Sequence, residues 1–337
     1  MLSAFLTGGI PAGLFFRTCN SLIGRHCPSA LALPPHSMDS NSNKINKLVI
    51  VGVGLIGGSF SLALKQAGLV AHVTGVGRSQ ANLQRALQLG VIDSIGSDIG
   101  SAARDADLVL LAVPVGQMGD IMRQLAPVLP PHAIVSDAGS TKQDVVALAR
   151  QELAVHLPRF IPAHPIAGAE KSGAAAAMPD LYRNRNLVLT PLPENRPDAL
   201  LTVRRLWEAC GARVREMTPQ QHDGVFAAVS HLPHLLAFAL VDAIANKDDA
   251  EQCFQFAASG FRDFTRIASS SPEMWRDISL ANRDALLHEL DSYAQQLQRL
   301  RLLLQQSDSQ GLLDLFAHAR SARDAWLDSQ QAARKPG

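Results

Sequence analysis

The stretch that decides the fold is residues 47–57, which read Lys47-Leu48-Val49-Ile50-Val51-Gly52-Val53-Gly54-Leu55-Ile56-Gly57. An apolar run leads into three glycines spaced as G-x-G-x-x-G, and a helical pattern follows as far as Ala67, where Gly68 can end it in a left-handed cap. This glycine spacing is common by chance, but between a strand and a helix it is typical of the first βα unit of a dinucleotide-binding domain. The stretch therefore predicts a Rossmann-type fold.

Each glycine of this turn has a distinct expected role. Gly52 allows the tight turn, Gly54 lets the backbone approach a pyrophosphate, and Gly57 lets the helix pack close to the strand. The free amides that begin the helix, at Leu55 and Ile56, then face the phosphates. The alternative interpretation is a glycine-rich turn that binds no ligand.

The choice between the two nicotinamide cofactors depends on the end of the second predicted strand, 73–76. NAD-binding domains usually place a carboxylate about twenty residues after the motif, where it binds the ribose 2′-hydroxyl. Gly77, Arg78 and Ser79 occupy that place here, and no Asp or Glu lies within residues 58–92. An arginine and a hydroxyl suit a 2′-phosphate, so the sequence favours NADP, with NAD as the alternative.

From residue 46 to about 217, short apolar runs alternate with helical patterns, as in an open α/β sheet. Continuous Val, Leu and Ile in these runs indicates strands buried on both faces, as in a parallel sheet. Val113 and Pro114, where the third strand ends, are expected to contact the cofactor. The predicted strands are 47–51, 73–76, 108–113, 133–136, 160–163 and 187–190.

After about Met217 the pattern changes, and no convincing strand is predicted. Helical patterns cover 225–245 and 272–305, and the second carries a stripe of leucines, namely Leu280, Leu287, Leu290, Leu297, Leu300 and Leu304. Such a stripe can form the core of one chain or pack against a second copy, and we expect a homodimer joined through this region. The sequence thus predicts a dinucleotide-binding domain over 46–217 and an all-helical substrate and dimerisation domain over 218–337.

Residues 1–45 are excluded from the predicted fold. The first 37 residues are rich in Gly, Pro, Ser and Leu and contain no acidic residue, but they lack the basic start and cleavage site of a secretory signal. Met38 begins a short polar lead into the first strand. We expect a disordered extension or a segment that precedes the true start at Met38, with a genuine leader as the alternative.

Bulk composition fits a globular protein with a small-molecule substrate. Lys and Arg number 31 against 30 for Asp and Glu, so no charge excess favours a nucleic-acid or membrane partner. No apolar run was expected to reach the length of a membrane span. The cysteines have no metal-binding spacing, so we expect no metal and reduced thiols in a cytoplasmic protein. They are Cys19, Cys27, Cys210 and Cys253.

Three further segments carry polar residues where catalytic groups usually lie. Ser140 follows a buried strand at the edge where such sheets bind ligands, although its spacing to Gln143 is also that of a capping box. His164 stands at the end of an apparent strand, before a glycine loop. Ser230 and His234 share one face of an otherwise apolar helix, where buried polar groups need partners or a ligand.

Together these segments resemble the prephenate/arogenate (cyclohexadienyl) dehydrogenase family. The resemblance covers roughly residues 46 to 305 in the expected order, and its His-Pro-Ile-Ala-Gly and Asp-Phe-Thr-Arg elements are more specific than the glycine motif. Ala169 stands where family members often have Thr or Ser, and the acidic residue of NAD-using members is missing near Gly77. The matching elements are 51–59, 138–142, 164–170, His222-Asp223 with 230–234, 260–268 and 272–277.

The resemblance implies an NAD(P)-dependent oxidative decarboxylation in tyrosine biosynthesis, of prephenate to 4-hydroxyphenylpyruvate or of arogenate to tyrosine. His164 is the implied catalytic base toward the ring hydroxyl, and Ser140 is implied to orient it and the nicotinamide amide. Arg266 is the implied anchor for a dianionic substrate, with Arg262 on the same face if the segment is helical. A solvated helix face is the alternative for both arginines.

Ser230 and His234 are implied to line the pocket beside the side chain of the substrate. His234 is compatible with prephenate, but the choice between prephenate and arogenate stays open, as does tyrosine feedback inhibition. One rival is another dehydrogenase with this domain pair, acting on β-hydroxy acids or imines; it would usually need a helical-domain lysine, which 225–245 lacks. A non-catalytic dinucleotide sensor is the other rival, and it has no use for His164, Ser140 and Arg266 together.

Overall fold

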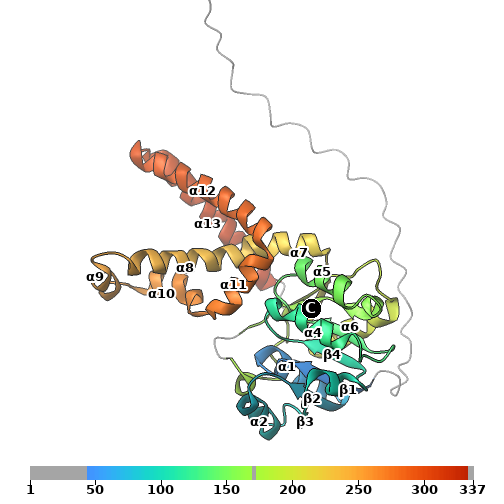
Figure 1. Cartoon of the computed structure of the whole chain (residues 1–337). Helices are drawn as coiled ribbons and strands as arrows, with labels where there is room; N and C mark the ends of the chain where they lie inside the picture. Colours follow the sequence, from blue (N-terminus) through green and yellow to red (C-terminus); the bar gives the residue numbers. More distant parts are fainter. Residues whose placement is uncertain (1–43, 169–171, 333–337) are drawn as a thin grey trace, which may run out of the picture. The chain divides into compact units, whose positions relative to one another are not determined.

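The computed structural model describes residues 44–168 and 172–332, and its largest feature is a six-stranded parallel sheet (Figure 1). The strand order is β3-β2-β1-β4-β5-β6, so the order reverses between β1 and β4. Sheets of this kind bind ligands outside the carboxyl ends of the strands at such a reversal. The strands are β1 (Ile45–Val51), β2 (Val70–Val76), β3 (Ser94–Ile95), β4 (Leu108–Leu111), β5 (Ile134–Asp137) and β6 (Phe160–Ile161).

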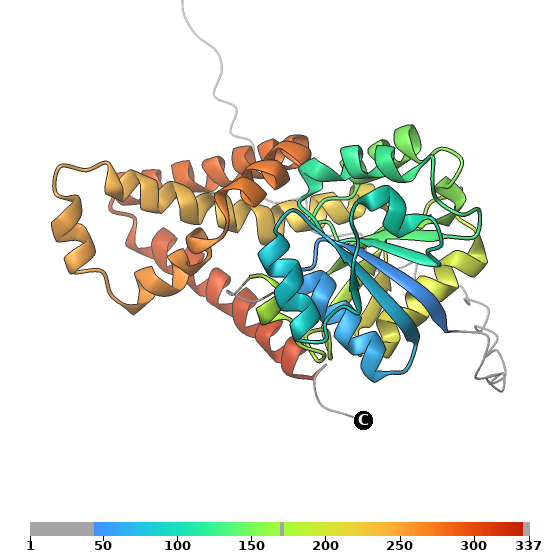
Figure 2. The same cartoon turned by 60° about the horizontal axis from the view of Figure 1, so that its bottom comes forward.

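Helices cover both faces of this sheet (Figure 2). Leu48 and Ile50 of β1 belong to one core and Val49 and Val51 to the other, because successive side chains of a strand point to opposite faces. The first core takes residues of α1 (Leu55–Gln66), α2 (Gln80–Gln88) and α6 (Pro197–Ala209). The second takes residues of α3 (Ile99–Ala103), α4 (Met118–Leu125) and α5 (Gln143–Glu152).

A second, three-stranded sheet follows the large one along the chain and contains His164. It consists of β7 (Ala163–Pro165), β8 (Asn186–Leu189) and β9 (Arg213–Glu216), with β7 antiparallel and β9 parallel to β8. The single strand predicted over 160–163 is wrong, because the chain leaves the large sheet at Pro162 and pairs with β8 instead. Proline cannot donate to a strand ladder, which favours this break. The strands β3 and β9 were not predicted, since one has two residues and the other is largely charged.

From Pro219 onward, every regular element that the structure describes is helical. The predicted helix 225–245 begins earlier than expected and contains a π-turn, and the predicted helix 272–305 is divided at Asn282. The prediction of a nucleotide-binding domain followed by an all-helical domain is confirmed. The helices are α7 (Pro219–Phe226), α8 (Leu232–Ala245), α9 (Ala250–Gln255), α10 (Ser259–Thr265), α11 (Pro272–Ala281), α12 (Arg283–Gln305) and α13 (Ser309–Ala332).

Helix α11 fastens the helical region to the sheet region within the compact unit Asn43–Gly337. Its Trp275 and Ile278 are buried in the core that also holds α4 and α5. Gly116 lies against the same helix, because a Cβ there would come within 2.7 Å of a carboxylate oxygen of Asp277. The prediction for residues 1–45 falls, apart from Lys44 and Ile45, outside the described residues, and Ile45 already belongs to β1.

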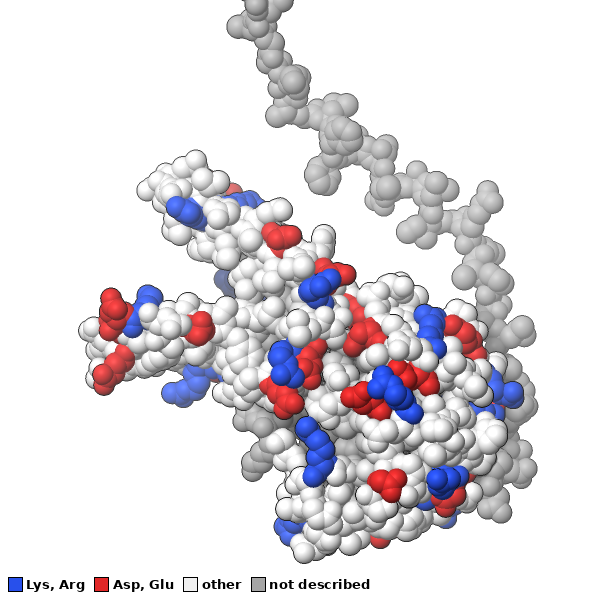
Figure 3. Space-filling view, in the orientation of Figure 1, with Lys and Arg blue, Asp and Glu red and all other residues white. Residues whose placement is uncertain are grey.

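One expectation about apolar runs is corrected. Helical residues Pro219–Ala245 are long and apolar enough to cross a membrane by length and composition, and 28% of the apolar window is buried. This is weak evidence for a membrane span, because the core helix of a soluble protein can pass the same test. On the face shown in Figure 3, acidic and basic side chains are interspersed, in keeping with their nearly equal numbers of 30 and 31.

Candidate active site

The glycine motif forms an open cradle at the carboxyl end of β1. Gly52 has a φ of 95°, and a Cβ there would lie 2.4 Å from the carbonyl oxygen of Ala112, so a larger residue does not fit. A Cβ at Gly57 would lie 2.6 Å from the carbonyl oxygen of Gly52, which shows how closely α1 approaches the turn. A Cβ at Gly54, by contrast, would meet no atom within 4 Å, so the backbone there is open to a ligand.

The start of α1 is suited to an anion. Gly54 is its N-cap and provides no side-chain hydrogen bond, so the first amides, beginning at Leu55, are not capped by their own segment. The carbonyl oxygen of Ile56 accepts a hydrogen bond of 2.6 Å from the hydroxyl of Tyr182, which holds the first turn in place. The cradle therefore fits a dinucleotide pyrophosphate, although the contacts themselves remain a prediction.

The end of β4 borders the same turn. A Cβ at Gly52 would lie 2.8 Å from the side chain of Val113, which places Val113 directly beside the glycine cradle. Pro114 follows it, is also partly buried, and precedes the short 3-10 turn Val115–Gln117. Both residues thus lie where the sequence placed them, at the carboxyl edge of the sheet.

The end of β2 leads into an exposed segment. Gly77, Arg78 and Ser79 are all exposed, and the Ser79 hydroxyl accepts a hydrogen bond of 3.3 Å from the amide of Asn82, which caps α2. A Cβ at Gly77 would meet only Leu83, at 3.6 Å, which is ordinary van der Waals contact. A side chain at position 77 is therefore sterically acceptable.

His164 lies on β7, and a chain of hydrogen bonds runs from its ring into the helical domain. Its Nδ1 lies 2.8 Å from Nε2 of His222, and Nδ1 of His222 lies 2.8 Å from Oδ1 of Asp223. The backbone amides of Lys142 and Gln143 donate to the two carboxylate oxygens of Asp223, each at 2.8 Å. His222 and Asp223 belong to α7 and are fully buried, so the second domain holds the ring from behind.

Asp223 also replaces an expected helix cap. The capping box predicted between Ser140 and Gln143 is wrong, because α5 begins at Gln143 with Lys142 as N-cap and without a side-chain cap from its own segment. The carboxylate of Asp223, 80 residues further along the chain, accepts the free amides instead. A negative charge at a helix N-terminus is favourable because the helix dipole is positive there.

A buried ion pair fixes β7 from the other side. The ammonium group of Lys142 contacts the carboxylate of Asp137, and both side chains are fully buried. Asp137 also accepts hydrogen bonds from the amides of Gly139, at 2.8 Å, and Ala163, at 3.1 Å. A buried charge needs such partners to offset its lost hydration. Because Ala163 precedes His164, this carboxylate positions the strand that carries the histidine.

Burial keeps the two linked histidines neutral near pH 7. Loss of hydration lowers the pKa of His164 well below 6.5, and the charges of His222 and Lys142 act in the same direction. Burial also lowers the pKa of His222, opposed by its hydrogen bond to Asp223. For Asp223, burial raises the pKa, but hydrogen bonds from His222 and from two backbone amides outweigh it, so the pKa is lowered overall. The hydrogen-bonded series from His164 through His222 to Asp223 thus consists of two neutral rings and one carboxylate.

Ser230 lies in the π-turn Ala227–His231 and His234 in α8, both in the helical domain. Nδ1 of His234 lies 2.8 Å from the carbonyl oxygen of Ser230, and its ring stacks on Trp275 at a centroid distance of 3.7 Å. The indole N–H of Trp275 has no hydrogen-bond partner within the described residues. Burial lowers the pKa of His234, and the positive charge of Arg266 contributes to this shift. The charge of Arg266 thus acts on the ring of His234.

The two candidate arginines occupy different kinds of helix. Arg262 lies in α10, whereas Arg266 begins the 3-10 turn Arg266–Ser269, and both are exposed. The neighbouring Phe264 is also exposed, at 49% on the single chain. Their contact with substrate remains a prediction.

Several residues that build this site had no role in the sequence argument. Asn282, at the break between α11 and α12, donates to the backbone carbonyl of Asp223 at 2.8 Å and lies 3.1 Å from Nδ1 of His231. His222 and Asp223 appeared only among the matched family elements. Their signal was the adjacent His-Asp pair at the start of an apolar helix.

The structure tests the expected role of Ser140 only in part and does not describe Ala169. The backbone of Ser140 interacts with His231, which places the end of β5 against the helical domain. The orienting contact expected from Ser140 to His164 stays a prediction, since Nδ1 of His164 is hydrogen-bonded with His222 instead. Ala169, the departure from the family pattern, lies outside the described residues.

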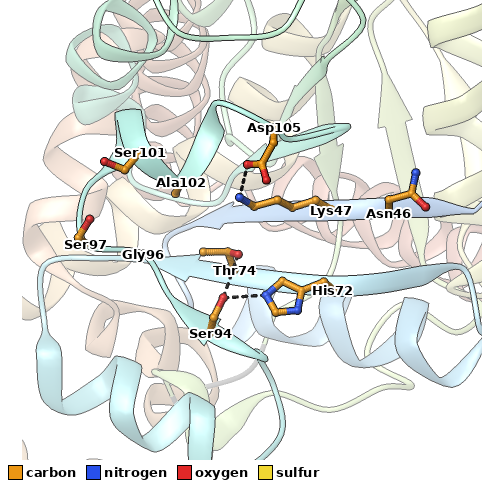
Figure 4. A pocket seen from close by; sticks show the side chains of 10 residues that line it. All are labelled: Asn46, Lys47, His72, Thr74, Ser94, Gly96, Ser97, Ser101, Ala102 and Asp105. Atoms are coloured by element: carbon orange, nitrogen blue, oxygen red, sulfur yellow. Dashed lines mark hydrogen bonds and ion pairs between the residues drawn. The ribbon is translucent and has the colours of Figure 1, made fainter.

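A polar depression of about 550 Å³ lies at the opposite edge of the sheet (Figure 4). It is lined by residues near the amino ends of β1 and β2, where Lys47 contacts Asp105 and His72 lies 2.8 Å from the hydroxyl of Ser94. These groups already pair with one another, and none belongs to the motifs at the carboxyl edge. Within residues 44–168 and 172–332, no three His, Cys, Asp or Glu side chains are arranged to hold a metal ion.

The fold and this edge define an enzyme of the dehydrogenase class, with a nucleotide-binding domain and a helical domain that meet at His164. Comparison with known families gives a closer assignment. Residues 60–216 match the model "Prephenate dehydrogenase, nucleotide-binding domain", and residues 218–318 match "Prephenate dehydrogenase, dimerization domain". The chain belongs to the prephenate/cyclohexadienyl dehydrogenase family of tyrosine biosynthesis and is itself an enzyme of this kind.

Individual relatives agree with this membership. The chain is 38% identical to a prephenate dehydrogenase of Bacillus subtilis over 85% of this chain and 77% of the relative. It is 36% identical to a cyclohexadienyl dehydrogenase of Zymomonas mobilis over 82% of this chain and 94% of the relative. A prephenate dehydrogenase structure from Aquifex aeolicus, in complex with hydroxyphenyl propionate and NAD+, superimposes with a TM-score of 0.79 at 35% identity, covering 84% of this chain and 99% of that one.

The buried neutral histidines predict that acid destabilises the fold. Burial is the main cause that lowers the pKa of His231, to about 4. An unfolded histidine titrates near 6.5, so as the pH falls below that value protons bind the unfolded chain first. The free energy of unfolding should therefore fall below about pH 6.5, by on the order of 2 kcal/mol for this residue at pH 5.

Guanidinium unfolding at about pH 7.5 and about pH 5 measures this effect. The matched variant His231→Gln has no titrating ring, so its unfolding free energy should change less between the two pH values. A residual pH dependence is expected from His164, His222 and His234, whose pKa values are also lowered. An equal pH dependence in both proteins would contradict the prediction.

Proposed function

We propose that this chain oxidises and decarboxylates prephenate, arogenate or both, with His164 as the base that takes the proton of the ring hydroxyl. The observation that carries the proposal is the place of His164, which lies on the short strand β7 at the carboxyl edge and is bonded at Nδ1 to a residue of the other domain. Its ring is neutral near pH 7 because burial lowers its pKa. A neutral imidazole suits general-base catalysis at this pH.

The chemistry has two steps at the substrate ring, an oxidation at C4 and a decarboxylation. A nicotinamide bound beyond the glycine cradle supplies the acceptor for the hydride that leaves C4. His164 takes the hydroxyl proton as the C4 carbonyl forms. The bond between the ring and its carboxylate then breaks, and carbon dioxide leaves. The electron pair of that bond makes the ring aromatic and turns the C4 oxygen into a phenolate. The protonated His164 can return its proton to that oxygen, so one residue serves both steps.

Residues of the helical domain are proposed to anchor the substrate. Arg266 is proposed to bind a carboxylate of the dianionic substrate, since a guanidinium offers paired donors to a carboxylate. After burial, the positive charge of Arg266 contributes to the lowered pKa of His234, which supports this place. Arg262 is proposed as a second positive charge, and Ser230 with His234 as the lining beside the substrate side chain. Ser140 is proposed to orient His164 and the nicotinamide amide.

Replacing the proposed base tests the function. His164→Asn should lower kcat for prephenate by about 10²–10⁴-fold, because general-base assistance contributes this much. Dinucleotide affinity should stay nearly unchanged, since the glycine cradle is intact. Reduced-nicotinamide absorbance measures turnover, and fluorescence titration measures the affinity. A variant that kept most of its rate across neutral pH would show that His164 is not the base. An unmodified chain that turned over neither prephenate nor arogenate would favour the dinucleotide sensor.

NADP is proposed as the favoured cofactor, with NAD as the alternative. The proposal rests on the exposed end of β2, where Gly77 supplies no carboxylate to repel a 2′-phosphate and Arg78 offers a positive charge. Ser79 caps α2 with its hydroxyl and lies beside the same position. The Aquifex aeolicus relative was crystallised with NAD+. The preference for NADP is therefore argued only from the residues of this chain.

Two substitutions test the cofactor preference. Gly77→Asp should shift the kcat/KM ratio toward NAD, and the added side chain fits sterically. Arg78→Ala should weaken NADP and spare NAD. We expect shifts of about tenfold to a hundredfold, because these charges are exposed and screened by salt. Arg85→Ala, a matched loss of charge later in α2, should leave the ratio unchanged. A tenfold or greater preference of the unmodified enzyme for NAD would contradict the proposal.

A homodimer through the helical domain is proposed as the assembly. The matching family model describes this region as a dimerization domain. The leucine stripe of α11 and α12 is largely uncovered on the single chain, with Leu280 66% and Leu304 61% exposed. Much of the apolar run Pro219–Ala245 is uncovered as well. A second copy of this chain is the proposed cover for these faces.

Light scattering at micromolar concentration tests the assembly and should give twice the mass of 36.1 kDa. Leu297→Glu, in the exposed stripe of α12, should weaken the dimer because it places a charge in an apolar interface. Gln295→Glu adds the same charge on the other side of α12 and should not. A monomeric unmodified protein would contradict the proposal.

We also propose a cytoplasmic location. Cys210 and Cys253 are both free thiols, the state expected in a reducing compartment. Cell fractionation with an antibody to the chain tests this location.

A further inference from the structure

The hydrogen-bond chain behind His164 has a direction, and that direction can be read from its last member. Both carboxylate oxygens of Asp223 accept backbone amides at 2.8 Å, which a carboxylate does and a protonated carboxyl group does less well. An ionised carboxylate can only accept. The Nδ1 of His222, 2.8 Å from Oδ1, must therefore be the donor and carry a proton.

The proton positions on the two imidazole rings follow from this donor. A neutral imidazole has one N–H, so His222 with its proton on Nδ1 presents a bare Nε2 as an acceptor. That Nε2 lies 2.8 Å from Nδ1 of His164, so Nδ1 of His164 must carry a proton and donate it to this bond. His164 is then left with an unprotonated Nε2. This nitrogen is the one not engaged with His222, and a base needs a lone pair there.

We propose that His222 is a positioning residue that, held by Asp223, fixes His164 as the Nδ1–H tautomer and so reserves its Nε2 lone pair for the substrate hydroxyl. The inference rests on the proposed role of His164 as the base. A charged His222 would reverse the bond and consume the lone pair of His164 at Nδ1. Burial disfavours this form, since the pKa values of both rings are lowered.

The geometry leaves little room for another arrangement. The carboxylate of Asp223 is fixed by the first amides of α5, and the backbone of Asp223 is fixed by Asn282. His222 is fully buried, and its ring lies 4.5 Å from that of Phe226, measured between centroids. His164 comes from the nucleotide-binding domain, whereas His222 and Asp223 come from the helical domain. Docking of the two domains thus sets the proton position of the base.

The first test compares two variants at position 222 that differ in one property. Gln and Met have similar length and volume, and both remove the ring. The Gln side chain can accept from Nδ1 of His164 and donate to Asp223, whereas Met can do neither. His222→Gln should stay within about tenfold of the unmodified kcat, and His222→Met should lose about 10²-fold or more, as loss of a correctly protonated base implies. KM should change little in both, because position 222 lies behind His164.

The second test observes the tautomer directly and does not depend on activity. Spectra of the protein with ring-15N histidine distinguish a protonated from a bare ring nitrogen, and the His164 signals are those missing in His164→Asn. At about pH 7.5, His164 should carry its proton on Nδ1 in the unmodified protein and in His222→Gln. His222→Met should shift it toward Nε2. The unmodified protein alone decides the central point if His222→Met does not fold.

The outcomes separate this inference from the function on which it rests. An Nε2–H or doubly protonated His164 in the unmodified protein, or equal losses of kcat in folded His222→Gln and His222→Met, overturns the role of His222. High turnover in His164→Asn instead overturns the role of His164 as the base, while the tautomer spectrum still reports on His222.

Discussion

The catalytic edge depends on one carboxylate, that of Asp223. It caps the first amides of α5 in one domain while it belongs to α7 of the other, and it also holds the ring of His222. A buried carboxylate costs hydration, and these three charge-assisted bonds offset the cost. Because the same group closes a helix end, joins two domains and orients a histidine, none of the three features can move independently of the others.

This constraint explains why the proposed base, His164, lies at a domain junction. The nucleotide-binding domain supplies the glycine cradle and His164, and the buried pair of Asp137 and Lys142 holds β7 in place. The helical domain supplies the groups behind His164 and the wall around His234. Either domain alone would contain an incomplete site. The apolar area that the helical domain leaves uncovered is assigned, in the proposed homodimer, to assembly rather than to chemistry.

Local signals in the sequence predicted much of this arrangement. The apolar runs and the spacing from Gly52 to Gly57 predicted the first βα unit, because strand burial and tight turns depend on neighbouring residues. The cap of α5 was mispredicted because its true partner, Asp223, lies 80 residues from Gln143. His222 was given no role for the same reason. Its partner, His164, lies 58 residues away in the chain, and no periodicity records such a contact.

A crystal structure of the chain with dinucleotide and 4-hydroxyphenylpyruvate, the product expected from prephenate, would show which side chain faces the reacting oxygen. The phenol oxygen stands where the substrate hydroxyl would lie. With His164 as the base, this oxygen should lie within about 3.2 Å of Nε2 of His164, with Nδ1 of the same ring still bonded to His222. A phenol oxygen bound by another side chain, or a His164 ring turned away from His222, would contradict this assignment.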